Sequence, residues 1–574
     1  MRKIIHDEQY DDKDLAVDLE KGFQLVGEVP RSHVLPEKLL PATISTTDLS
    51  RNSRKANVAL RYMTRSSGSE DLDNRLWEKT LTEVDRGWLV GPLVWEDLPN
   101  DATVSRRFPL EQSGKVRPID DLSQSQVNAT VTVFEQATVD GPDVICAFAV
   151  FMMRCLSSMG KSTCLQGRAL DLASAYRQLA IADESSKHSY LSVYSPSSKK
   201  AELFRQVALP FGSRTAVNAF IRCARFLQWV SARCLRLPLS CYFDDFVSFA
   251  TPNLANNTQA ALCLVLDILG WNFDREGPKS DDFSQLVKAL GVQFDLSQCA
   301  DGVLSVCNTE KRIQETVDLI DGVLDSGFLD KKSALVLRGR LAFCDSFIFG
   351  RIGKIALQNI TRHAYASPFR PELSASLVDS IKLLKDRVLT GRPRQLHCDL
   401  LQPMYLFTDA SFDPQKGGGL GAVLVSHEGR VISWFGFWAE TSDLAIFLAD
   451  GRETAIGELE TLVVAMALFI WCQRLKSTPL MVYIDNEGSK FSLIKGYSSS
   501  QSITAICALA ATYLDSYCIL PWFSRVPSAS NLADFPSRLK DHPLLKRDLR
   551  VSDGEVKDAF SGSMSFIRQA RAPQ

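Results

Sequence analysis

The chain has 574 residues, too many for one hydrophobic core, so we expect about three to five structural units. Hydrophobic residues make up 45% of it and charged residues 23%, as in ordinary soluble globular proteins, and the net charge of −2 says nothing about partners. The 14 cysteines form no CxxC pair and have only 7 histidines beside them, which argues against zinc fingers and a disulfide framework.

The N-terminus predicts an intracellular protein. Met1–Glu8 mixes basic and acidic residues and has no apolar core of a secretory signal. The longest apolar runs, Val144–Met153 and Leu462–Trp471, are about half of the roughly 20 residues that a bilayer-spanning helix needs. We expect a cytoplasmic or nuclear location, or both, with no secretion and no membrane partner.

A first set of acids lies in the middle of the chain. Ala169–Leu172 is typical of a buried strand that ends at Asp171, and Leu239–Ala250 places Asp244 and Asp245 between apolar and aromatic residues. Since burying an uncompensated charge costs several kcal/mol, we expect a tight hairpin that keeps both acids solvated or on a metal. With Asp171 from a neighbouring strand, the three carboxylates could hold two Mg²⁺ ions roughly 3.5–4 Å apart for phosphoryl transfer.

Residues 308–389 are predicted to be helical, because apolar residues recur at helical spacing. Four basic residues lie in or just after the clearest part of this pattern: Arg338, Arg340, Arg351 and Lys354. Such residues ordinarily form a solvated helix face. Behind a nucleic-acid site they would instead contact phosphates.

A second set of acids lies in the C-terminal third. Apolar strands end at Asp409 and Asp485, Glu460 lies near the start of the helix predicted over residues 456–471, and Asp534 lies in a further helical turn. A mixed sheet would gather these four carboxylates at one edge. Such a site binds two Mg²⁺ ions and hydrolyses phosphodiesters with an activated water.

Five motifs follow one another in the order found in retroelement reverse transcriptases. They resemble the fingers segment at Gly114–Asp121 (GKVRPIDD), the template-grip motif at Leu209–Gly212 (LPFG), the YxDD box at Tyr242–Asp245 (YFDD), the block with a lysine near the leaving pyrophosphate at Leu269–Ser280, and the primer-grip hairpin at Leu290–Val292. One departure is Val217, where related retroelements usually have proline. The resemblance implies an α+β right-hand polymerase with fingers, thumb and a ferredoxin-like palm.

This resemblance also implies roles for single residues. Asp171 and Asp244 would bind the metal ions with Asp245 in support, and Tyr176 would be the aromatic gate that excludes a ribose 2′-OH. Contacts with the incoming nucleotide are implied for Lys115, Arg117, Tyr176, Phe211, Gly212 and Lys279. The basic helical segment would be the thumb, laid along the duplex.

The C-terminal motifs resemble the ribonuclease H domain of retroelements, an α/β domain with a mixed sheet. TDAS at Thr408–Ser411, a helical glutamate, YIDNEGS at Tyr483–Ser489 and NLADFPSR at Asn531–Arg538 occur in the family's order. The implied metal ligands are Asp409, Glu460, Asp485 and Asp534. The combination is most similar to Ty3 and DIRS-like retrotransposons.

The helical glutamate has an alternative, because Glu458 lies two residues from Glu460. We prefer Glu460, since Ala467-Leu468 follows it at the family's usual distance. Glu458 would then be an acid at a helix start, where the macrodipole favours it. His542 is a weak candidate for the histidine that assists product release in some ribonucleases H.

Composition and resemblance together predict five regions. They are a flexible N-terminal extension at 1–75, fingers and palm at 76–307, thumb and connection at 308–402, a ribonuclease H-like domain at 403–540, and a charged, weakly patterned C-terminal tail at 541–574.

The predicted function is RNA-directed DNA polymerase of a retrotransposon-like element. The enzyme would use an RNA template, a DNA primer and dNTPs, with two Mg²⁺ ions per site (Mn²⁺ would also serve), and would degrade the RNA strand of RNA–DNA hybrids. One alternative is a catalytically decayed remnant that only binds nucleic acid, against which the intact acid sets argue. Another is an RNA-templated RNA polymerase, against which Tyr176 and the second acid set argue.

Overall fold

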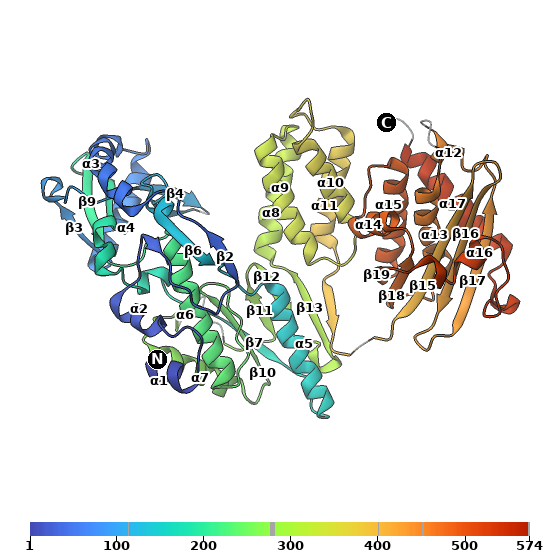
Figure 1. The fold of residues 1–574 in the computed structure, drawn as a ribbon, viewed down its shortest axis with the longest axis horizontal. Helices are drawn as coiled ribbons and strands as arrows, with labels where there is room; N and C mark the ends of the chain where they lie inside the picture. The colour runs from blue at the N-terminus through green and yellow to red at the C-terminus, as the bar shows by residue number, and fades with distance from the viewer. Residues whose placement is uncertain (113, 276–281, 400, 450–452, 572–574) are drawn as a thin grey trace. The chain divides into compact units, whose positions relative to one another are not determined.

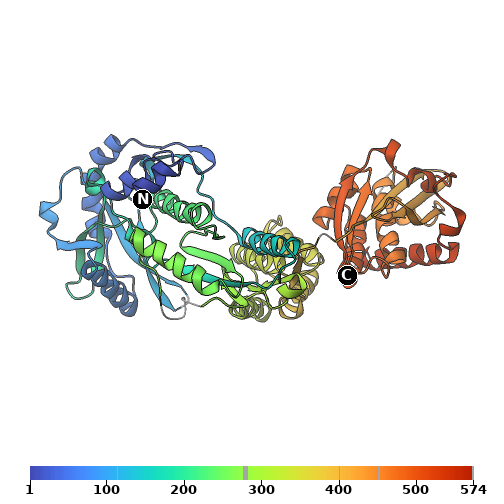
Figure 2. The ribbon, with the colours of Figure 1, turned by 90° about the horizontal axis from the view of Figure 1, so that it is seen from below.

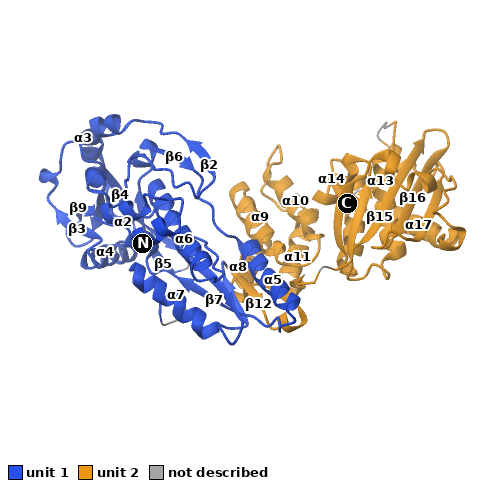
Figure 3. Cartoon of the chain, turned by 60° about the horizontal axis from the view of Figure 1, so that its bottom comes forward, with its two compact units in different colours: residues 1–290 blue, residues 291–574 orange. Residues whose placement is uncertain are grey.

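The computed structural model describes residues 1–112, 114–275, 282–399, 401–449 and 453–571. Within them the chain is a mixed α/β protein of several domains, as predicted (Figures 1 and 2). It divides into two compact units, Met1–Leu290 and Gly291–Gln574 (Figure 3). In the described part of the chain, no helix combines the length and apolar character needed to cross a bilayer.

The N-terminal residues are folded into unit 1, and the prediction of a flexible extension is wrong. Tyr10 and Leu15 are 3% and 0% exposed and belong to the main core of this unit. Asp12 pairs with Arg222 at 2.7 Å, and both side chains are at most 2% exposed. A few buried apolar side chains and one buried ion pair are enough to fold this segment, although its composition, on which the prediction rested, is polar. The helices of this region are α1 (Arg2–Asp7), α2 (Leu15–Lys21), α3 (Thr46–Met63) and α4 (Glu70–Asp85).

Unit 1 also contains a three-stranded sheet of order β1-β6-β2 and a five-stranded sheet of order β3-β9-β8-β4-β5. Residues along β5 alternate between buried and exposed, as a strand with one covered face requires. The strands are β1 (Gly27–Glu28), β2 (Glu37–Leu40), β3 (Leu89–Leu93), β4 (Val104–Gln112), β5 (Lys115–Asp121), β6 (Val131–Glu135), β8 (Tyr190–Ser195) and β9 (Lys200–Gln206).

The rest of unit 1 is built around an antiparallel ribbon of β7 (Gln166–Asp171) and β10 (Asp245–Ala250). Core residues of α6 (Arg214–Arg233) and α7 (Ala255–Leu269) pack with those of the ribbon in one hydrophobic cluster. The helix α5 (Pro142–Ser158) and the strand β11 (Leu286–Ala289) complete the unit. The core fixes the strand ends that carry the first set of acids.

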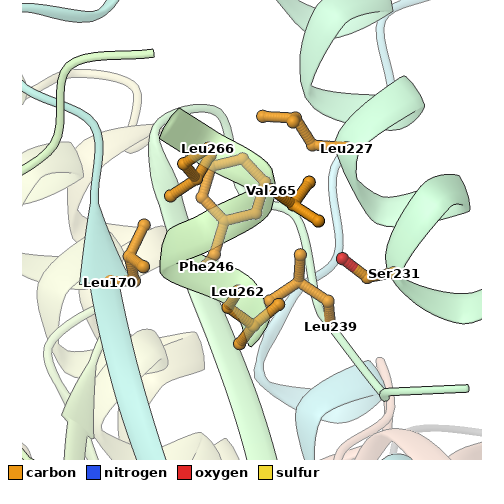
Figure 4. A pocket seen from close by; sticks show the side chains of 8 residues that line it. All are labelled: Leu170, Leu227, Ser231, Leu239, Phe246, Leu262, Val265 and Leu266. Atoms are coloured by element: carbon orange, nitrogen blue, oxygen red, sulfur yellow. The ribbon is translucent and has the colours of Figure 1, made fainter. Parts of the chain in front are cut away.

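A small apolar cavity lies inside this packing (Figure 4). Its volume of about 20 Å³ is enough for roughly one water molecule and too small for an organic ligand. It is lined by Leu170, Leu227, Ser231, Leu239, Phe246, Leu262, Val265 and Leu266.

Unit 2 begins with short strands and a bundle of four helices. The strands β12 (Val292–Asp295), β13 (Val303–Asn308) and β14 (Arg394–His397) pair in antiparallel order. Apolar residues of all four helices form one core, as helical spacing predicts. The bundle consists of α8 (Glu310–Ser326), α9 (Lys331–Ser346), α10 (Gly353–Ala364) and α11 (Ala375–Thr390).

The C-terminal part of unit 2 is a mixed five-stranded sheet of order β17-β16-β15-β18-β19. The helices α13 (Ile456–Trp471) and α15 (Gln501–Ser516) share the largest core cluster of the chain with its strands. The strands are β15 (Met404–Asp413), β16 (Gly417–Val425), β17 (Val431–Ala439), β18 (Pro479–Ile484) and β19 (Leu520–Arg525), and the shorter helices are α12 (Ala445–Leu448), α14 (Glu487–Lys495) and α16 (Asp534–Ser537).

The predicted C-terminal tail contains a 19-residue helix, α17 (Asp553–Arg571), so the boundary at residue 540 is wrong. Val556, Phe560 and Met564 are buried in the same core as α13 and α15. Their spacing of four residues places them on one helix face. Charged residues on the opposite face hide this pattern in the sequence.

Candidate functional site

The hairpin that carries Asp244 has the tight geometry expected from the sequence. Tyr242 and Asp245 exchange both backbone hydrogen bonds, at 2.9 and 3.0 Å, so that Phe243 and Asp244 form a two-residue turn. Phe243 has a φ of 51°, the left-handed conformation that such turns require. Asp244 is partly exposed and Asp245 exposed, which leaves both carboxylates accessible.

The register of the ribbon brings Asp171 to the same end. Asp171 lies directly opposite Asp245, and the N–H of Leu172 donates to the carbonyl oxygen of Asp244 at 3.1 Å. Asp171 is 9% exposed, the most buried of the three acids. Residues far apart in sequence therefore place three carboxylates at one strand end.

Tyr176 lies beside these acids in an aromatic cluster. Its ring makes edge contacts with Phe211 and Phe220, with centroids 5.1 and 5.0 Å apart. Burial, followed by the nearby charge of Asp244, raises the pKa of Tyr176 to about 12. The hydroxyl therefore stays protonated at neutral pH. The ring is held between Phe211 and Phe220.

Phe211, which contacts Tyr176, lies with Gly212 in a loop that Asn128 holds through hydrogen bonds. The Asn128 side-chain amide donates to the carbonyl oxygen of Gly212 at 2.9 Å, and Asn128 Oδ1 accepts from the N–H of Arg214 at 2.9 Å. Gly212 has a φ of 95°, which favours glycine at this turn. Asn128 therefore holds the start of α6 in place.

Two of the remaining nucleotide-binding candidates lie on β5. Lys115 and Arg117 are exposed on one side of this strand, and Val116 between them is buried. Lys279 lies outside the described residues.

A buried ion network next to Tyr176 was missed from the sequence. Arg107 bonds Asp120 at 2.7 Å and Glu83 at 2.8 Å, and Arg177 bonds Glu83 at 3.0 Å. The two arginine side chains are at most 2% exposed. The network fixes the residue after Tyr176. No local signal could have found it, because its members come from distant segments.

The second set of acids forms a tight cluster. Oxygen atoms of Asp409, Glu460 and Asp485 lie within 4.8 Å of one another, which is true of no other group of metal-ligand side chains in the described residues. The first set of acids is therefore more widely spaced. Carboxylate oxygens at this spacing suit Mg²⁺.

Burial and the charges of neighbouring carboxylates both raise pKa values in this cluster. Burial, followed by the charges of Asp485 and Asp409, raises the pKa of Glu460 to about 9. Burial raises the pKa of Asp409 to about 6, although a hydrogen bond from Ser537 opposes this shift. Glu460 Oε2 is buried and has no hydrogen-bond partner among the described residues. These observations fit a group of acids that holds divalent cations.

Glu458 faces a different partner. Ser500 Oγ, at the start of α15, donates to Glu458 Oε1 at 2.9 Å, and Glu458 is 4% exposed. Glu460 lies at the acid cluster instead. The geometry favours Glu460 over Glu458 as the helical ligand.

Asp534 lies at the edge of the cluster. It pairs with Arg538 at 2.7 Å, and its charge contributes to the raised pKa of Asp409. Ser537 Oγ donates to Asp409, and Ser528 Oγ donates to Asp485 Oδ2 at 3.0 Å. Both serines were missed from the sequence, although Ser537 lies one helical turn after Asp534 in the NLADFPSR motif. His542 packs against Phe535, with ring centroids 4.4 Å apart.

Glycines let the helical turn of Asp534 lie directly on the sheet. A Cβ atom at Gly421 of β16 would overlap the backbone of Ser537, and one at Gly436 of β17 would overlap the backbone of Pro536. The close approach of α16 to both strands therefore needs residues without side chains.

The four basic candidates of the bundle divide into two pairs. Arg338 and Arg340 are exposed on α9, near an open depression lined by Lys331, Lys332, Leu335 and Val336. Arg351 and Lys354 differ, because their cationic groups donate to carbonyl oxygens of the mixed-sheet domain.

No protein-family model matches the chain, and no curated protein matches it either. Among solved structures, the foamy viral protease-reverse transcriptase bound to RNA/DNA hybrid is 12% identical with a TM-score of 0.44, over 92% of this chain and 59% of that one. The same protein bound to dsDNA is 13% identical with a TM-score of 0.43, over 90% of this chain and 93% of that one. Similarity at this level carries no information about activity.

Proposed function

We propose that this chain is a reverse transcriptase with ribonuclease H activity from a retrotransposon-like element. The observation that carries the proposal is the pairing of Asp171 with Asp245 in register, which places the YFDD turn and a strand-end acid side by side. The cluster of Asp409, Glu460 and Asp485 supports a second, hydrolytic site.

At the first site, Asp171 and Asp244 would hold two Mg²⁺ ions, whose charge would favour ionisation of a primer 3′-OH and departure of pyrophosphate. Tyr176 would exclude a ribose 2′-OH, because its ring is held rigidly against Phe211 and Phe220. Triphosphate contacts are proposed for Lys115, Arg117 and Lys279. These cations would balance the charge of the incoming dNTP.

At the second site, Asp409, Glu460, Asp485 and Asp534 would hold the cations that activate a water for phosphodiester hydrolysis. Ser537 and Ser528 orient two of these carboxylates through hydrogen bonds. The unpartnered oxygen of Glu460 fits a ligand role, since a cation would compensate its burial. The fingers–palm–thumb and ribonuclease H-like arrangement is part of this proposal.

The bundle would hold the duplex through α9. Arg338, Arg340 and the lysines near them offer positive charge for phosphates. Gly339 lies between them, with nothing in the described chain within 4 Å of the place of a Cβ atom. A glycine inside a helix costs about 1 kcal/mol relative to alanine, so an open glycine here suits close approach of a nucleic-acid backbone.

A pair of variants tests the proposal. Wild-type protein should extend a DNA primer on an RNA template with dNTPs and Mg²⁺, and should cut the RNA of a labelled RNA–DNA hybrid. Asp244→Asn should lose extension by about a hundredfold or more and keep cleavage, whereas Asp485→Asn should do the reverse. Each variant is thus the folding control of the other.

Two results would overturn the proposal. Folded wild-type protein without either activity would favour the decayed remnant. Cleavage retained in Asp485→Asn would exclude the assigned ligand set.

A further inference from the structure

In unit 2, hydrogen bonds join the helical bundle to the mixed-sheet domain. Asp515, near the end of α15, accepts hydrogen bonds from the start of α10. The N–H of Arg351 donates to both carboxylate oxygens at 2.8 Å, and the N–H of Ile352 donates to Oδ2 at 3.1 Å. Backbone N–H groups at a helix start lack partners within the helix, and the macrodipole favours an anion there.

The side chain of Arg351 makes the opposite contact. Its guanidinium donates to the carbonyl oxygens of Leu493 and Ile494 at 3.0 and 2.7 Å, in the last turn of α14. Lys354 Nζ donates to the same Ile494 oxygen at 3.2 Å. Carbonyl oxygens at a helix end attract cations. Each domain therefore supplies a charge that satisfies a helix terminus of the other.

The packing leaves little room at this contact. Gly350 has a φ of 107°, and a Cβ atom there would overlap the Asp515 carboxylate. Arg387 of α11 lies 2.7 Å from Asp345 and 3.7 Å from Asp515. These three side chains are between 10% and 18% exposed. Removing one partner from a buried charge network is costly, so the network favours a single arrangement of the two domains.

The helix α14 connects this contact to the second acid cluster. It begins at Glu487, two residues after Asp485. Ser489 Oγ donates to the carbonyl oxygen of Gly457 at 3.2 Å, one turn before Glu460 on α13. The end of α14 is therefore held by the bundle, and its start is held beside two of the metal-ligand candidates.

We propose that Arg351 and Asp515 are positioning residues for hybrid cleavage. Their contacts fix the position of the mixed-sheet domain relative to the bundle. If the bundle holds the RNA strand, this fixed distance determines which phosphodiester of the strand reaches the acid cluster. This inference rests on the proposed hydrolytic function. It gives Arg351 and Lys354 an internal role in place of the phosphate contacts expected from the sequence.

The test compares the full chain with Asp515→Ala, and uses Asp558→Ala on α17, a solvent-exposed acid, as the matched control. Hydrogen exchange of the Arg351 and Ile352 amides should become about tenfold faster in Asp515→Ala, since they lose their acceptor. On a long, end-labelled RNA–DNA hybrid, cleavage should spread from preferred positions to their neighbours. Asp558→Ala should match the wild type in both measurements.

A second variant covers a failure of Asp515→Ala to fold. Asp515→Asn keeps an acceptor for the N–H groups and loses the charge, so we expect a smaller change in both measurements. The inference is overturned if the Arg351 and Ile352 amides of Asp515→Ala exchange at the wild-type rate. It is also overturned if these amides exchange faster while the cleavage positions stay the same. If wild-type protein cuts no hybrid, the proposed function fails, and exchange alone then decides whether Asp515 holds the two domains together.

Discussion

Glu458 and Glu460 lie two residues apart on α13, yet only Glu460 faces the acid cluster, because Glu458 accepts from Ser500 Oγ at 2.9 Å. Two residues on an α-helix differ in direction by about 200°, so the two carboxylates cannot share a site. Helix geometry thus supports Glu460 as the ligand candidate in the choice that sequence spacing left open.

Substitution of each glutamate by glutamine should separate their roles. Glu460→Gln should lower hybrid cleavage by about a hundredfold or more, because a charged ligand is lost. Glu458→Gln keeps an acceptor for Ser500 and should retain cleavage within about threefold. Initial cleavage rates at saturating Mg²⁺ measure both effects. Equal losses would contradict the assignment.

The acid cluster should make stability depend on pH in the absence of divalent cations. Asp409 and Glu460 have pKa values of about 6 and about 9, above those of the unfolded chain. As the pH rises, the unfolded chain therefore loses these protons before the folded chain does. The two carboxyl groups contribute fully to the free energy of unfolding below about pH 4, and this contribution is lost as the pH rises through 6 and 9. Thermal unfolding with EDTA should show this decline.

Millimolar Mg²⁺ should restore the lost stability at high pH, because a cation binds the ionised carboxylates. Glu460→Gln should be more stable than the wild type in EDTA at pH 8, on the order of 2 kcal/mol, and should gain less from Mg²⁺. A variant less stable than the wild type under these conditions would contradict the repulsion described for the cluster.

Tyr176 should control the choice of sugar. Tyr176→Ala removes the ring held between Phe211 and Phe220, and should reduce the preference for dNTPs over rNTPs by about tenfold to a hundredfold. Tyr176→Phe keeps the ring and should keep the preference. Single-nucleotide insertion gives kcat/KM for both substrates. Unchanged discrimination in Tyr176→Ala would assign the gate to another residue.

The N-terminal residues should be needed for the stability of unit 1. Asp12→Ala removes the 2.7 Å partner of the buried Arg222 side chain, which should cost about 3 kcal/mol. Asp11→Ala changes an exposed neighbour and should cost less than about 0.5 kcal/mol. Chemical denaturation measures both values. If Asp12→Ala leaves the free energy of unfolding unchanged, the expectation of a loose N-terminal extension would be restored.

Local patterns predicted much of what the structure shows. The strand ending at Asp171, the hairpin at Asp244 and the helix of Glu460 follow from apolar runs and turn residues, which act over a few positions. The fold of residues 1–75 could not be predicted in this way, because Asp12 and Arg222 are 210 positions apart. The internal contacts of Arg351 could not be predicted for the same reason, since its partners lie more than 140 positions further along the chain.

The closeness of α16 to the sheet has a consequence for how substitutions at this site should be interpreted. Gly421 and Gly436 carry no functional group, but alanine at either position would push the turn of Asp534 and Ser537 away from β16 and β17. Such a chain would keep every acid of the second set and still place one of them wrongly. Loss of cleavage in a variant with all four carboxylates intact would then reflect a displaced backbone rather than missing chemistry.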